Sequence, residues 1–112
     1  MSKIAIRGWI ELPPPQFFDG AIAIVGLDDV TLIHAPSQRL AETVIEGIHG
    51  RQDRIPFSLE VNRNFQPSGR YVLAAEIRCS GENRLRPGDF LTTVAVPWSD
   101  ATEGNVVPVS RI

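Results

Sequence analysis

Apolar and polar residues alternate with a period of two along much of this chain of 112 residues. The stretch "RIPFSLEVNRNFQPSGRYVLAAEIRC", residues 54–79, shows the alternation most clearly. Because successive side chains of a strand point to opposite faces, it predicts two half-buried strands joined by a turn-rich connection. Their predicted inward faces are Phe57, Leu59 and Val61, followed by Tyr71, Leu73, Ala75, Ile77 and Cys79.

The same alternation predicts further strands at residues 3–11, 20–28, 40–49, 89–96 and 105–111. Residues 40–49 have some helical character, but their β-branched residues and Gly47 favour a strand. We expect "LPPPQFFDG", residues 12–20, to be irregular, because three consecutive prolines remove backbone donors. The turn at residues 80–83 is expected to form a hairpin into residues 84–86.

About seven short strands, with no amphipathic helix between them, predict an all-β fold. Their length and spacing favour a single-domain β-sandwich of immunoglobulin-like proportions over residues 1–112, with a small barrel as the alternative. Only the architecture is implied, because the paired cysteines of immunoglobulin domains are absent and Cys79 is the single cysteine. Its position in the alternation predicts a small buried hydrophobic residue rather than a reactive thiol.

Charge and hydropathy exclude several classes of partner. The net charge of −2, with both signs interspersed, argues against a nucleic-acid partner. The longest apolar segment, Ala21–Leu27, is too short to span a bilayer, so we expect no membrane insertion. The N-terminal residues show no secretory signal or lipobox, and a cytoplasmic location is therefore expected for the sequence as written.

Metal ligands are sparse in the sequence. The two histidines, His34 and His49, lack further ligands at close spacing, so a transition-metal site is not expected. No calcium-loop motif is present to gather the acidic residues. The acidic residues considered for such a site are Asp28, Asp29, Glu42, Glu46 and Asp53. We predict that the chain uses no metal and no cofactor.

Catalytic motifs are also absent, and we predict that the chain is not an enzyme. No phosphate-binding glycine loop or G-x-S-x-G motif occurs, and no base adjoins Ser37, Ser58 or Ser80 in the sequence. Four aromatic residues have two interpretations, core capping or an exposed binding surface. They are Trp9, Phe17, Phe18 and Trp98. The sequence assigns no catalytic, cofactor-binding, metal-ligating or partner-binding residue.

A series of segments has a more specific order and spacing than strand alternation. The segments are "VGLDDV" (25–30), "AP" (35–36), "LAE" (40–42), "GRQDRIPFSLEV" (50–61), "GRYVLAAEI" (69–77) and "FLTTVAV" (90–96). Together they resemble the YbaY/YscW-like family of small bacterial lipoproteins over roughly residues 4–97. That family includes the lipoprotein chaperones of type III secretion, the pilotins that escort a secretin to the outer membrane.

The resemblance implies a non-enzymatic module that captures a protein or peptide partner. Strand addition at an open sheet edge is the expected mechanism, with Pro56, Pro97 and Pro108 guarding some edges. The family is typically periplasmic or attached to the outer membrane. The alternative function is a small-ligand module, for example one that binds glycans on an aromatic platform such as Trp98. The oligomeric state is left open by the sequence.

Overall fold

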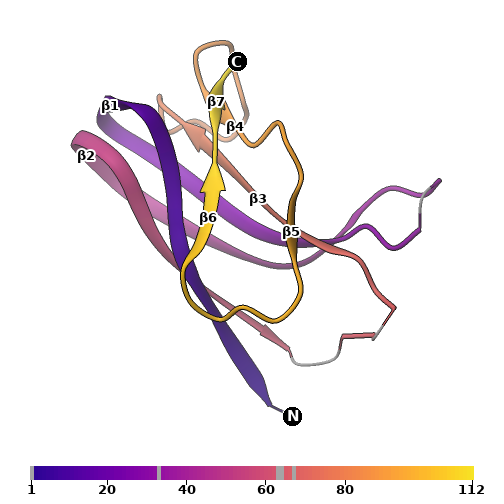
Figure 1. The fold of residues 1–112 in the computed structure, drawn as a ribbon. Helices are drawn as coiled ribbons and strands as arrows, with labels where there is room; N and C mark the ends of the chain where they lie inside the picture. Colours follow the sequence, from indigo (N-terminus) through magenta and orange to yellow (C-terminus); the bar gives the residue numbers. More distant parts are fainter. Residues whose placement is uncertain (1, 33, 63–64, 67) are drawn as a thin grey trace.

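A computed structural model describes residues 2–32, 34–62, 65–66 and 68–112 as an all-β domain with seven strands. Figure 1 shows that two long, bent strands dominate it. The strands are β1 (Lys3–Asp29), β2 (Gln38–Asn62), β3 (Tyr71–Arg78), β4 (Phe90–Leu91), β5 (Val96–Trp98), β6 (Asn105–Pro108) and β7 (Ser110–Arg111). Among the described residues, no helix is long and apolar enough to cross a membrane.

Each half of β1 lies between two other strands. The first half pairs antiparallel with residues 54–62 of β2 on one side and parallel with β6 on the other. The second half pairs antiparallel with residues 38–48 of β2 and with β3. β5 and β4 continue the sheet from β3, and β7 follows β4. All seven strands therefore belong to one sheet, in which β2 is an edge strand.

The proline-rich segment lies within β1, so the expectation that residues 12–20 are irregular was wrong for residues 16–19, which pair with β2. The pairing with β2 jumps here from Glu11 opposite Arg54 to Gln16 opposite Gln52. Four residues of β1 thus face a single residue of β2, and the three prolines lie in this bulge. Because bulged residues take no regular place in the ladder, their missing N–H donors remove no ladder hydrogen bond.

The two halves of β1 and β2 enclose one hydrophobic core. Ile6 and Ile10 come from the first half of β1, and Val25 and Leu27 from the second, and all four are buried. The core predicted from the alternation is confirmed: its five members are Phe57, Leu59, Tyr71, Leu73 and Ile77. Cys79 is half-buried and packs against this core, which fits its predicted apolar position.

Three expected features differ in the structure. Residues 89–96 are not one strand, because residues 92–95 lie opposite only two residues of β3 and bulge outward between β4 and β5. Residues 84–86 form no hairpin strand: Arg84 lies in a bend, and residues 85–86 have no regular secondary structure. Residues 105–111 divide into β6 and β7 at Val109, whose N–H donates to the carbonyl of Glu11.

The all-β prediction is confirmed, but a two-sheet sandwich of immunoglobulin type is not shown. The strand pairing joins all seven strands in one open sheet. The strands that would belong to separate sheets in a sandwich are joined here through the unbroken lengths of β1 and β2.

Candidate functional site

The outer side of β2 has no strand partner among the described residues, which makes it the longest open edge of the sheet. Its two longest segments of regular register with β1 are residues 54–62 and 41–45. Pro56 lies in the first segment, whereas the second contains no proline. Bulges bound the second segment at Leu40 on one side and at residues 46–47 on the other.

These two edge segments differ in how well their inward side chains are covered. Phe57, Leu59 and Val61 are buried although they lie on an edge strand. Ala41, Thr43 and Ile45 also face inward, as their pairing with the core residues of β1 requires, but they are only half-buried. Residues 41–45 therefore form an edge with both an open backbone and an incompletely covered inner face. We call this segment the open edge.

A bulge at the start of the open edge changes the direction of one side chain. Leu27 pairs with Ala41 and Asp28 pairs with Arg39, so Leu40 has no partner on β1. The Arg39 guanidinium lies on the outer face, where it forms salt bridges with the buried carboxylate of Asp28 and, at 3.0 Å, with Glu42. Because bulges re-aim side chains, the unpaired Leu40 can point inward.

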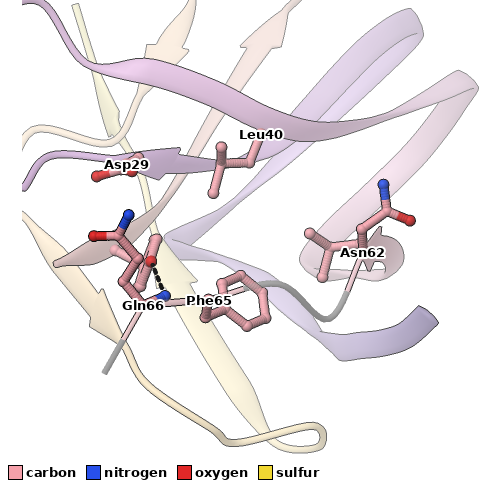
Figure 2. A pocket seen from close by; sticks show the side chains of 7 residues that line it. Asp29, Leu40, Asn62, Phe65 and Gln66 are labelled. Carbon is pink, nitrogen blue, oxygen red and sulfur yellow. Dashed lines mark hydrogen bonds between the residues drawn. The ribbon is translucent and has the colours of Figure 1, made fainter. Parts of the chain in front are cut away.

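Leu40 lines a pocket of about 180 Å³, which we call the mouth pocket. Figure 2 shows Leu40 and Phe65 projecting toward the same space, with Asp29 and Asn62 on opposite sides of it. The lining residues are Asp29, Leu40, Val61, Asn62, Phe65, Gln66 and Tyr71. The pocket thus lies where the two ends of β2 meet the start of β3.

An aromatic cluster of Phe65, Tyr71 and Trp98 forms part of the mouth pocket, which Phe65 and Tyr71 line. The Phe65 ring packs edge-on against Tyr71, with 5.1 Å between ring centroids, and lies 5.0 Å from the Trp98 ring. The Tyr71 hydroxyl accepts a hydrogen bond from the Gln66 N–H at 3.0 Å. Aromatic pairs of this geometry add to the stability that burial provides, so the contacts within the cluster stabilise the positions of Phe65 and Tyr71 in the pocket wall.

Asp29 is the charged residue that lines the mouth pocket. Its Oδ1 accepts a hydrogen bond of 2.9 Å from the Thr31 N–H. Hydrogen bonds from the side chain and the backbone of Thr31 lower the pKa of Asp29, and this effect exceeds the opposing one of burial. The carboxylate is therefore charged at neutral pH.

The structure does not gather the residues considered for a metal site. Asp28 and Glu42 share Arg39, and His49 Nδ1 lies 3.4 Å from Asp19. Within the described ranges, no three His, Cys, Asp or Glu side chains are arranged to hold a metal. The other metal candidates His34, Glu46 and Asp53 are exposed and distributed over the surface. The serines considered for catalysis are exposed as well: Ser37, Ser58 and Ser80.

The four aromatic candidates divide between the two interpretations. Trp98 and Phe18 are buried, as core capping predicts, and the Trp98 indole N–H donates to the Ala101 carbonyl at 2.7 Å. Trp9 is half-buried, with the Arg54 guanidinium 4.8 Å above its ring. Phe17 alone of the four is strongly exposed, at 77%. The platform suggested for Trp98 is therefore not available on the surface.

Sequence reasoning did not identify Leu40 or Phe65 as site residues. Leu40 was placed in a predicted strand, and alternation cannot show that a bulge precedes Ala41. Phe65 is an apolar residue in an otherwise polar, turn-rich connection, and that contrast was the available signal.

A solved structure shares the fold of this chain. The structure of an alternative pilotin from the type II secretion system of Vibrio cholerae is similar, with a TM-score of 0.75. The similarity covers 99% of this chain and 100% of the pilotin, at 23% sequence identity. No curated protein matches the sequence.

The sequence itself matches a family. Residues 2–96 match the family described as type III secretion system lipoprotein chaperone (YscW), nearly the same span as the resemblance seen in the sequence. The family consists of chaperones rather than enzymes. By this match over most of its length, the chain belongs to the YscW family of type III secretion system lipoprotein chaperones.

Proposed function

We propose that this chain is a secretion-chaperone module that captures a segment of a protein partner by strand addition along the open edge. Membership of a lipoprotein chaperone family and similarity to a pilotin support a protein partner. Pilotins act on secretins, so a secretin is the partner proposed.

The incomplete cover over the open edge is the observation that carries this proposal. Edge strands in general expose part of their inner face, but the inward residues Phe57, Leu59 and Val61 of the same strand are buried. On the neighbouring strand, Ala23, Val25 and Leu27 are fully buried beside half-buried Ala41, Thr43 and Ile45. The difference therefore belongs to residues 41–45 and not to edge position alone.

An added strand would satisfy both features of the open edge. Its backbone would pair with the outward N–H and C=O groups of residues 41–45, as in other cases of strand addition. Alternate side chains of the segment would then cover Ala41, Thr43 and Ile45. Each backbone hydrogen bond contributes only about 0.5–1.5 kcal/mol net, so a short edge needs these apolar contacts as well.

The direct test is binding of the purified secretin from the same organism, measured with two variants of adjacent residues. Thr43→Lys places a charge on the inner face, whereas Val44→Lys places the same charge on the outer face of the same strand. We expect Thr43→Lys to weaken binding by about tenfold or more, equivalent to about 1.4 kcal/mol. Val44→Lys should bind like the wild type.

Circular dichroism and the denaturation midpoint establish that both variants are folded. Equal binding by the two folded variants would contradict strand addition at the open edge. A wild-type chain that does not bind the secretin would contradict the proposed partner. The small-ligand alternative gains no support, because Trp98 is buried.

A further inference from the structure

We propose that the mouth pocket is the anchor site for the captured segment, which places one apolar side chain beside Leu40 and a Lys or Arg side chain against Asp29. The inference rests on the proposed function and specifies the chemistry of the partner. The occupant is therefore a peptide segment with an apolar residue and a cation close together.

The size of the mouth pocket suits one side chain. Its volume is about 180 Å³, and an apolar cavity of about 150 Å³ is known to accept benzene. A leucine- or phenylalanine-sized group therefore fits, whereas a second large side chain does not. Because the pocket adjoins the bulge that begins the open edge, a segment paired with residues 41–45 would reach it at one end.

The walls of the mouth pocket are apolar on opposite sides. Leu40 comes from the start of β2 and Val61 from its end, while Phe65 forms the wall opposite Leu40 (Figure 2). Leu40 is 39% exposed, so it has apolar surface that a partner can still cover. Fully burying a side chain of this size is worth about 1.5–3 kcal/mol, which makes the pocket a suitable position for an anchor residue.

Asp29 provides a negative charge in the wall of the pocket, and it forms no salt bridge with a cation among the described residues. Arg39, a nearby cation on β2, is held on the outer face by Asp28 and Glu42. The Asp29 carboxylate is ionised at neutral pH, and the hydrogen bonds from Thr31 lower its pKa further. A cationic side chain of the partner is the complementary group.

A second hollow continues the mouth pocket past Asp29. Asp29 and Gln66 line both, and the second hollow adds Thr31, Leu32, Pro36 and Gln38. Asp29 is therefore at the centre of a groove rather than at its end. The apolar anchor and the cation can thus come from alternate residues of one extended segment, whose side chains point to the same face.

The test measures secretin binding by four variants with unchanged open edges. Leu40→Asp removes the apolar wall, and Val94→Asp is its matched control, because Val94 is exposed on the connection between β4 and β5. Asp29→Asn removes the charge but retains an oxygen that can accept from the Thr31 N–H. Asp19→Asn is the control for that change on an exposed carboxylate.

We expect Leu40→Asp to weaken binding by about tenfold or more, with Val94→Asp unchanged. Asp29→Asn should weaken binding by about two- to fivefold at low salt, as for an exposed ion pair. When the ionic strength rises from about 0.05 M to about 0.5 M, the difference in affinity between the wild type and Asp29→Asn should disappear. Asp19→Asn should behave like the wild type.

The outcomes separate this inference from the proposed function. If Thr43→Lys abolishes binding while Leu40→Asp and Asp29→Asn bind normally, the anchor site is wrong and strand addition stands. If only Asp29→Asn binds normally, the cation preference is wrong and with it the proposed occupant. If Leu40→Asp and Asp29→Asn weaken binding while Thr43→Lys does not, the pocket acts without strand addition.

Discussion

Arg39 covers Gly26 on the outer face of the sheet, so that a methyl group at position 26 would overlap the guanidinium. Gly26 lies on β1 between Val25 and Leu27, and its lack of a side chain leaves the space through which Arg39 reaches Asp28. This arrangement fixes Arg39 outward and leaves the next residue, Leu40, in the bulge. The direction of Leu40 into the mouth pocket thus depends on a contact of its neighbour.

We predict that Arg39→Met destabilises the protein by about 1.5–3 kcal/mol, the range for a lost hydrogen bond to a charged group. The reason is that the buried Asp28 carboxylate would lose its partner. The measurement is the free energy of unfolding in urea. Arg51→Met, an exposed change on the same strand, is the control, and equal effects of the two would show that the Asp28 salt bridge contributes nothing.

Leu59→Ala is predicted to destabilise the protein by about 2–5 kcal/mol. Leu59 is fully buried at the centre of the core, opposite Ile6 in the pairing of β1 with β2. Ser58→Ala, the exposed neighbour on the same strand, should leave the urea midpoint nearly unchanged. A Leu59→Ala midpoint equal to that of the wild type would mean that the core does not depend on this side chain.

Gly8→Ala should weaken the attachment of β6 to β1. A Cβ at position 8 would overlap the backbone carbonyl of Asn105, which cannot move without shifting β6. We expect a loss of about 1–3 kcal/mol in unfolding free energy, the range for overpacking. Arg7→Ala removes only an exposed ion pair with Glu103 and should cost less than about 1 kcal/mol. Thermal unfolding of both variants tests the difference.

Cys79 is predicted to react slowly with iodoacetamide at neutral pH. Burial, and then the negative charge of Asp89, raise the pKa of the Cys79 thiol, which lowers the fraction of reactive thiolate. The alkylation rate should rise steeply above pH 9 and should increase on unfolding in urea. A rate in the folded protein equal to that in urea at neutral pH would contradict this prediction.

The sequence by itself determined the strands with regular alternation and their inward faces. Phe57, Leu59, Tyr71, Leu73 and Ile77 were identified as core residues because a period of two reports which face of a strand is buried. The all-β class and the family followed from the same segments and their spacing. These are properties of local sequence, so no knowledge of the tertiary structure was needed.

The tertiary structure decided where the strands end, how they pair and where the candidate site lies. Three prolines are accommodated in β1 because the register with β2 jumps there, and residues 92–95 bulge between β4 and β5 because only two residues of β3 lie opposite them. Register depends on contacts between strands distant in the sequence, and a bulge reverses which face a side chain occupies. For that reason, the direction of Leu40 and its meeting with Val61 and Phe65 could be known only from the fold.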